Sequence, residues 1–207
     1  MDSNQAKNTK SPTYTQRLIN KQTIWWKRLL GIQAPYRWNL MRLNPGFTLD
    51  VGCGIGRNLI HIKGNGVGID HNEQSVEITR KQGLTAFTLE EFQESTFNNR
   101  EQFDSILLAH VVEHMTQQEA AGLLKLYLPV LKSRGKVIII CPQEAGYKSD
   151  PTHVEFMDFS KLHNINKQLG LSVLREYSFP FPRFMGRLFI YNEFVVVSCK
   201  NNINQDQ

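Results

Sequence analysis

The chain has 207 residues, which is long enough for one domain with a complete hydrophobic core. Its hydrophobic content of 41% is typical of a globular protein. No stretch approaches the roughly 20 apolar residues of a membrane-spanning helix, so we expect a cytoplasmic protein without a transmembrane segment. The net charge of +5 is unevenly placed: residues 1–45 hold eight Lys and Arg against one acidic residue, and residues 46–207 hold sixteen against eighteen. This distribution argues against a basic nucleic-acid-binding core, and the basic segment favours an acidic partner.

The N-terminal 45 residues divide into a polar tail and a helical segment. Residues 1–12 are polar and are expected to be disordered. Residues 14–30 place apolar side chains on one face, which predicts an amphipathic helix, and residues 36–43 form a second segment. We expect residues 13–45 to form a helical cap on the core or a lid over an acceptor site, with attachment to a membrane surface as a further alternative.

From residue 46 onward, predicted strands and helices alternate. Continuous apolar runs separated by amphipathic segments predict a doubly wound, mostly parallel sheet. The predicted strands are residues 47–51, 67–70, 84–89, 103–109, 136–141, 171–178 and 189–198. The predicted helices are residues 57–62, 73–82, 117–131 and 160–169, the third opened by the capping-box sequence TQQE at residues 116–119. A polar tail, residues 201–207, closes the chain.

A glycine-rich turn follows the first of these strands. Its sequence is DVGCGIGR at residues 50–57, and the second strand ends in Asp70, eighteen residues after Gly52. Such glycines let the backbone approach a ligand closely, and an acid at that distance can accept hydrogen bonds from two ribose hydroxyls. The pattern is not the G-x-G-x-x-G of dinucleotide sites, because Arg57 stands where the third glycine is needed.

The pattern D-x-G-x-G-x-G instead resembles motif I of the class I S-adenosylmethionine-dependent methyltransferases. Residues 103–114, FDSILLAHVVEH, are similar to the fourth strand and following turn of the small-molecule branch of that family, and residues 131–137 resemble the lead-in to its fifth strand. The resemblance implies one domain over residues 46–200, with a seven-stranded Rossmann-like sheet whose last strand is antiparallel. It also implies S-adenosylmethionine as the cofactor.

The resemblance further implies a set of cofactor contacts. The glycine turn would pass under the methionine and ribose, Asp70 would bind both ribose hydroxyls, and Asp50 would orient the turn or reach the methionine amino group. An arginine would pair with the methionine carboxylate. The complete set of expected cofactor residues is Asp50, Gly52, Cys53, Gly54, Gly56, Arg57, Asp70, His71, Leu89, Glu90, Phe92, Ala109, His110 and Arg37. Of these, His71, Leu89, Glu90 and Phe92 would surround the adenine, and Ala109 and His110 would offer backbone carbonyls.

The acceptor side is expected in the polar loop after the fifth strand. His153 is the first candidate for a general base, with Asp150 orienting its ring, and His114 is the second. Together these features favour methyl transfer to an oxygen of a small molecule, without a metal ion. The chain lacks the Asp/Asn-Pro-Pro-Tyr/Phe run expected of nucleic-acid amine methylases. Protein or RNA methylation and a non-catalytic cofactor-binding subunit remain the alternatives.

Overall fold

The computed structural model describes residue 31 and residues 33–201. These residues fall into two compact units, an N-terminal unit that ends at Thr96 and a C-terminal unit that begins at Phe97. The predicted helix over residues 14–30 and the tails at residues 1–12 and 202–207 lie outside the described residues.

The N-terminal unit contains three parallel strands, with β2 paired to both β1 and β3. Every residue of β1 and β2 is buried, as expected for strands covered on both faces. In chain order the elements are α3 (Ala34–Arg42), β1 (Thr48–Val51), α4 (Arg57–His61), β2 (Gly66–Ile69), α5 (Glu73–Lys81), β3 (Ala86–Phe87) and α6 (Leu89–Glu94).

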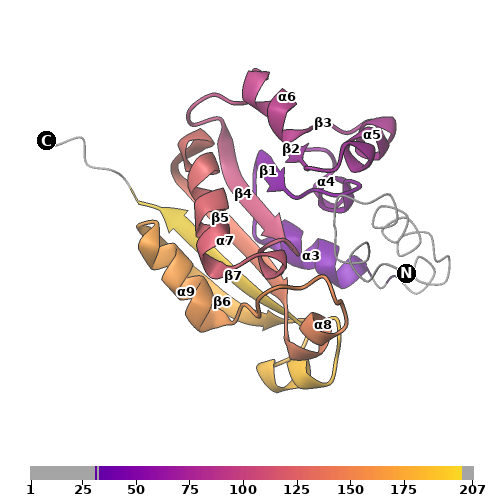
Figure 1. The fold of residues 1–207 in the computed structure, drawn as a ribbon, viewed down its shortest axis with the longest axis vertical. Coiled ribbons are helices and arrows are strands. Elements are labelled where there is room, and N and C mark those ends of the chain that lie inside the picture. Colours follow the sequence, from indigo (N-terminus) through magenta and orange to yellow (C-terminus); the bar gives the residue numbers. More distant parts are fainter. Residues whose placement is uncertain (1–30, 32, 202–207) are drawn as a thin grey trace, which may run out of the picture. The chain divides into compact units, whose positions relative to one another are not determined.

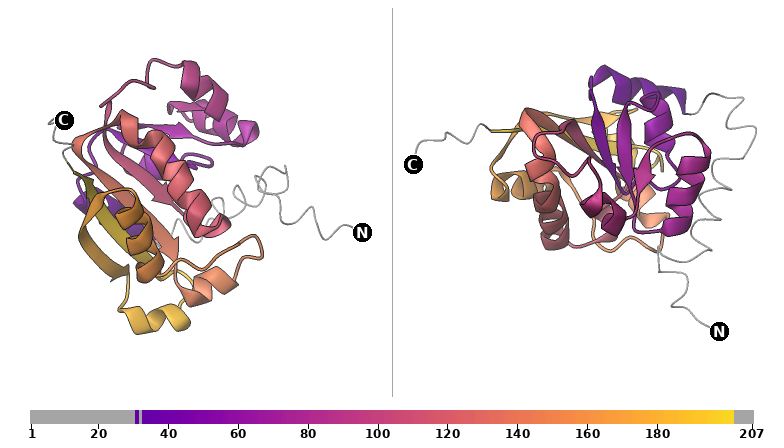
Figure 2. Two further views of the ribbon diagram at one scale, coloured as in Figure 1. Left: turned by 60° about the vertical axis from the view of Figure 1, so that its left-hand side comes forward. Right: turned by 90° about the horizontal axis from the view of Figure 1, so that it is seen from above.

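The C-terminal unit contains four strands. The β4 and β5 strands are parallel, and β7 lies antiparallel between β5 and β6. The α7 and α9 helices lie side by side against these strands (Figures 1 and 2). The elements are β4 (Phe103–Ala109), η2 (Val112–His114), α7 (Gln117–Tyr127), η3 (Leu128–Val130), β5 (Leu131–Pro142), α8 (Glu144–Lys148), α9 (Phe159–Gln168), β6 (Leu171–Phe179), η4 (Arg183–Arg187) and β7 (Glu193–Lys200).

Several predicted elements have different bounds in the structure. The fifth strand begins at Leu131 rather than residue 136. The strand expected over residues 84–89 is reduced to Ala86–Phe87, because Thr88 and Glu91 form a capping box that starts α6. The helix expected to continue to residue 131 ends at Tyr127, one residue before a 3₁₀ turn that contains Pro129. The last strand begins at Glu193 rather than residue 189, after the short helix η4 that the sequence did not predict.

The predicted fold class is confirmed. By hydrogen-bond pairing the strand order is β3-β2-β1-β4-β5-β7-β6, and the last strand is antiparallel. In the part of the chain that the structure describes, no helix is both long enough and apolar enough to cross a membrane.

Candidate functional site

The glycine turn after β1 folds onto the end of β2. The amides of Gly52 and Cys53 both donate to the carbonyl of Ile69, at 2.8 and 3.0 Å. Gly56 is in the left-handed region, with a φ of 81°, and begins α4. A Cβ atom there would lie 2.9 Å from Leu84 Cδ1, so this position requires glycine for both its conformation and its space.

Asp70, at the end of β2, holds this turn in place. Its Oδ2 accepts a hydrogen bond from the Gly54 amide at 2.8 Å, and its Oδ1 accepts one from the Asn72 amide at 2.8 Å. A carboxylate oxygen has two lone pairs, so each oxygen can accept one more hydrogen bond. His71 Nδ1 lies 3.7 Å from Asp70 Oδ1, and its side chain is exposed. Asp70 and His71, both predicted cofactor residues, therefore lie at the edge of the glycine turn.

Asp50 is buried at the end of β1 and is only partly satisfied. Asn58 Nδ2 donates to its Oδ1 at 3.4 Å, whereas Oδ2 has no hydrogen-bond partner. Burial raises the pKa of Asp50 to about 7, and the charge of Asp70 adds to this effect, while Asn58 and Arg57 oppose it. An unpaired buried carboxylate oxygen is costly, so this atom marks a place where a cationic or hydrogen-bonding ligand would fit.

The two predicted arginines belong to neighbouring helices, Arg37 to α3 and Arg57 to the first turn of α4. Burial together with the charges of Arg57 and Arg37 lowers the pKa of His61 to about 4. Both guanidinium groups therefore act on the same buried imidazole, and the N-terminal unit concentrates positive charge near α4. The sequence analysis did not select His61, because nothing in its local pattern distinguishes it from a surface residue of an amphipathic helix.

Apart from His71, the residues expected around the adenine belong to α6 rather than to a strand end. Leu89 is half-buried and Glu90 is exposed, so both are accessible. Phe92 is only 1% exposed and is part of the hydrophobic core. Its ring therefore has little accessible surface, and its contact with the adenine stays a prediction.

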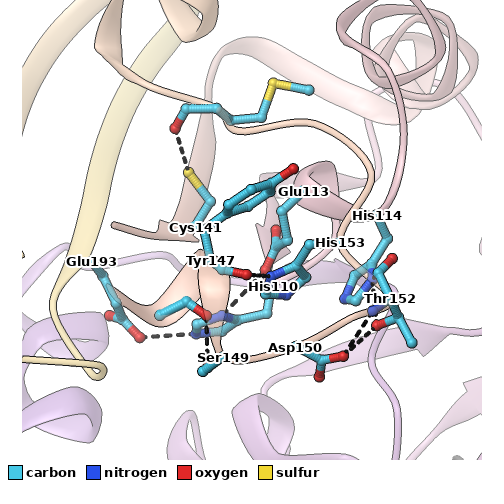
Figure 3. A network of polar contacts seen from close by, with 12 residues as sticks. His110, Glu113, His114, Cys141, Tyr147, Ser149, Asp150, Thr152, His153 and Glu193 are labelled. Carbon is cyan, nitrogen blue, oxygen red and sulfur yellow. Dashed lines mark hydrogen bonds and ion pairs between the residues drawn. The ribbon is translucent and has the colours of Figure 1, made fainter. Parts of the chain in front are cut away.

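In the C-terminal unit, Ala109 ends β4 and His110 follows in the left-handed region, with a φ of 61°. The His110 ring lies between two carboxylates, with Nε2 2.8 Å from Glu193 Oε1 and Nδ1 3.3 Å from Glu113 Oε1 (Figure 3). Burial alone would lower the pKa of His110, but the two carboxylates outweigh it and raise the pKa to about 9. The sequence predicted a role only for the backbone carbonyl of His110, because Glu193 comes from β7 and is too far along the chain for any local signal.

The predicted catalytic residues are brought together by the loop after α8 (Figure 3). The rings of His114 and His153 meet edge to face, with centroids 4.9 Å apart. His153 Nδ1 lies 2.6 Å from the carbonyl of Tyr147, whose ring stacks on the imidazole. Asp150 Oδ1 accepts hydrogen bonds from the amide and hydroxyl of Thr152. Tyr147 therefore orients His153, where the sequence predicted Asp150.

His114 is held from the same loop. Its Nδ1 lies 3.2 Å from both the carbonyl oxygen and Oγ1 of Thr152. Burial lowers the pKa of His114, and the neighbouring His153 contributes in the same direction. This shift favours the neutral ring, which can accept a proton or a metal ion. Glu113, His114 and His153 place one possible ligand atom each within 4.8 Å of one another.

Comparison with known proteins agrees with this geometry. Residues 49–139 match the family model described as a methyltransferase domain. No curated protein matches the chain. Among solved structures, an S-adenosylmethionine-dependent methyltransferase from Archaeoglobus fulgidus is 19% identical, with a TM-score of 0.62, over 86% of this chain and 98% of that one. A possible histamine N-methyltransferase from Thermotoga maritima is 19% identical, with a TM-score of 0.65, over 89% and 96%.

A third similar structure is the magnesium protoporphyrin IX methyltransferase of Synechocystis PCC 6803 with bound SAM. It is 14% identical, with a TM-score of 0.59, over 93% of each chain. At these identities the likeness concerns the fold. The matched domain and the fold together confirm the family resemblance that the glycine turn indicated.

Proposed function

With a methyltransferase domain at residues 49–139, in the fold of the class I S-adenosylmethionine-dependent methyltransferases, we propose that this protein transfers a methyl group from S-adenosylmethionine to an oxygen of a small molecule. The buried Asp50 and Asp70 beside the glycine turn carry the cofactor part of this proposal. The histidine pair His114 and His153 carries the acceptor part.

The residues of the N-terminal unit fit the cofactor. Asp70 keeps one free lone pair on each oxygen, which suits the two ribose hydroxyls. The unpaired Oδ2 of Asp50 suits the methionine ammonium, directly or through a water molecule. Arg57 and Arg37 supply the positive charge that the methionine carboxylate needs. Leu89 and Glu90 on α6 are the accessible candidates for the adenine.

The bound cofactor supplies a methyl group on a positively charged sulfur together with a neutral thioether as the leaving group. The protein then has to hold the acceptor in line and help it lose a proton. His114 and His153 each present a ring nitrogen, Nε2, that makes no hydrogen bond among the described residues. Burial lowers the pKa of His114, and an imidazole in its neutral form suits this task.

The charge distribution supports a small acceptor. Residues 46–207 hold sixteen basic and eighteen acidic residues, so the domain has no excess positive charge for a nucleic-acid backbone. After β4 the chain continues with His110 in the left-handed region and a 3₁₀ turn at Val112–His114. This segment lacks the proline pair expected of nucleic-acid amine methylases. Both observations favour a small molecule over RNA or DNA.

Cofactor binding is tested by calorimetric titration with S-adenosylmethionine. Asp70→Asn keeps the shape of the side chain and removes its charge, so we expect Kd to rise about tenfold to a hundredfold, which corresponds to one or two hydrogen bonds to a charged group. Asp104→Asn is the matched control, because Asp104 pairs with Lys132 on the surface of the C-terminal unit. Thermal melting of each variant confirms that it is folded.

Equal affinity in folded Asp70→Asn and in the unchanged protein would remove the cofactor assignment.

The acceptor is identified in a separate experiment, by incubating the protein with methyl-labelled cofactor and fractions of a cell extract. Label in a low-molecular-weight product with an O–CH₃ resonance supports the proposal, whereas label confined to protein or RNA contradicts its acceptor part.

A further inference from the structure

Three side chains with metal-binding atoms meet in the C-terminal unit. Glu113 and His114 belong to the 3₁₀ turn after β4, and His153 belongs to the loop after α8 (Figure 3). Their nearest ligand atoms all lie within 4.8 Å of one another. We propose that Glu113, His114 and His153 form a binding site for one divalent transition-metal ion, of the class of Zn²⁺ or Mn²⁺.

The two histidines are already in the tautomer that a metal requires. His153 Nδ1 lies 2.6 Å from the Tyr147 carbonyl, and His114 Nδ1 lies 3.2 Å from the Thr152 carbonyl. A carbonyl oxygen only accepts hydrogen bonds, so each Nδ1 carries the proton and each Nε2 keeps its lone pair. Metal-binding histidines characteristically donate their second nitrogen to a carbonyl or carboxylate in this way.

A second contact strengthens this arrangement at His114. The hydroxyl of Thr152 donates to Asp150 Oδ1 at 2.7 Å, so its oxygen is left to accept from His114 Nδ1 at 3.2 Å. Asp150 thereby acts on the ring through Thr152. Such outer hydrogen bonds fix the direction of the ligand atom and raise its basicity.

Glu113 provides an independent observation that points to a cation. It is 1% exposed, and neither of its oxygens has a hydrogen-bond partner. Among the described residues, His110 Nδ1 lies 3.3 Å from Glu113 Oε1, and His110 Nε2 lies 2.8 Å from Glu193 Oε1. Two carboxylates therefore share one imidazole in a buried place, which is costly unless further positive charge compensates them. A divalent ion at Glu113 supplies that charge.

The donor set indicates which ions fit. Two imidazole nitrogens and one carboxylate oxygen suit Zn²⁺ and other first-row transition ions better than Mg²⁺ or Ca²⁺, which prefer oxygen ligands. Ligands at about 2.1 Å from a tetrahedral ion are about 3.4 Å apart, so binding draws these three atoms together by roughly an ångström. Three protein ligands leave a position open for water or for a substrate oxygen, as in catalytic zinc sites.

The role of this ion deepens the proposed function and rests on it, whereas the site itself rests on the geometry alone. An acceptor hydroxyl bound at the open position loses its proton to water at lower pH than the free hydroxyl. Its oxygen then forms the new C–O bond as the C–S bond of the cofactor breaks and the electron pair remains on sulfur. In this reaction the two histidines bind the metal ion instead of accepting a proton. Water receives the proton of the acceptor hydroxyl.

The site is tested with the full, untagged chain after treatment with EDTA and removal of the chelator. Calorimetric titration with Zn²⁺ should show one site per chain, and titration with Co²⁺ should give the visible absorption of a low-symmetry site with nitrogen ligands. His153→Gln and His114→Gln should each lower the association constant about tenfold or more. His163→Gln is the matched control, because His163 pairs with Glu176 on the surface.

Glu113→Gln tests the third ligand, and its thermal melting shows whether the buried amide is tolerated. Because His153 is only half-buried, His153→Gln gives a reading that does not depend on that tolerance. The proposal is overturned if the chain binds neither ion, or if His153→Gln and His114→Gln bind them as tightly as His163→Gln does.

These measurements need neither cofactor nor acceptor, so the two proposals fail separately. Zinc binding without binding of S-adenosylmethionine would leave the metal site and remove the methyltransferase proposal. Cofactor binding and methyl transfer that persist in EDTA, in a chain that does not bind Zn²⁺, would remove the metal site and leave the histidines as proton acceptors.

Discussion

At the scale of single residues, buried carboxylate oxygens indicate where ligands are expected. Asp70 uses both oxygens to hold the glycine turn and the start of α5. Asp50 and Glu113, in contrast, each bury at least one oxygen that has no hydrogen-bond partner. Most buried polar atoms in proteins are satisfied, so an unsatisfied carboxylate in each unit is best explained by a ligand that the chain binds.

His110 gives the protein a predictable dependence of stability on pH. Its pKa is raised from 6.5 to about 9 in the folded state, so the charged ring stabilises the fold fully below about pH 6.5. This contribution is lost as the pH rises through about 9. We therefore expect the free energy of unfolding in urea to fall over this interval, and to fall less in Glu193→Gln, which removes one of the two carboxylates.

The control for this experiment is His163→Gln, since His163 forms an exposed pair with Glu176. It should keep the same pH slope as the unchanged protein. A slope that is equal in Glu193→Gln and in the unchanged protein would show that the ion pair with Glu193 does not raise the pKa of His110.

At the scale of elements, side-chain caps decide where helices begin. Thr116 accepts a hydrogen bond from the Glu119 amide at 3.3 Å, and Glu119 accepts one from the Thr116 amide at 2.8 Å, which forms the predicted capping box of α7. Thr88 and Glu91 form the same motif at α6. The sequence analysis did not recognise this second box, because the apolar residues 84–89 favoured a strand.

Removing the cap of α7 should cost stability. Thr116→Ala deletes the oxygen that bonds the Glu119 amide, and loss of such a cap typically costs about 1 kcal/mol. Thr116→Ser keeps the oxygen and should stay close to the unchanged protein. Urea unfolding measures both, and equal losses in the alanine and serine variants would mean that the methyl group, not the cap, stabilises the helix.

At the scale of the whole molecule, the chain consists of two units that contain different kinds of functional side chains. The N-terminal unit contains the glycine turn, Asp50 and Asp70, which suit a nucleoside cofactor. The C-terminal unit contains the histidine pair and Glu113, which suit proton transfer or metal binding. The proposed reaction needs residues of both units.

Hydrogen exchange followed by mass spectrometry should separate the two sets. S-adenosylmethionine should slow exchange in residues 50–58 and 70–73, because the ligand closes on the glycine turn and Asp70. Zn²⁺ should slow exchange in residues 110–115 and 147–156, where its ligands and their hydrogen-bond partners lie. Protection by Zn²⁺ only in segments around His61, His71 or His163 would indicate binding elsewhere and would contradict the proposed site.

The sequence predicted much of the fold because its signals are local. Alternating apolar runs and helical patterns indicated the parallel sheet, and the glycine spacing with Asp70 indicated the cofactor class. These patterns depend on backbone conformation and side-chain burial over a few neighbouring residues. Element ends were less well predicted where two local signals compete, as at Thr88 and Pro129.

The sequence by itself determined the strand and helix pattern and the D-x-G-x-G-x-G turn, since each is written in adjacent residues. Only the tertiary structure decided which side chains share a site. The tertiary structure places Glu193 beside His110 and buries Phe92 in the core. It also shows that the Tyr147 carbonyl, through its contact with Nδ1, orients the ring of His153. The physical reason is that burial and long-range pairing set the charge, tautomer and accessibility of a side chain, and these depend on residues far away in the chain.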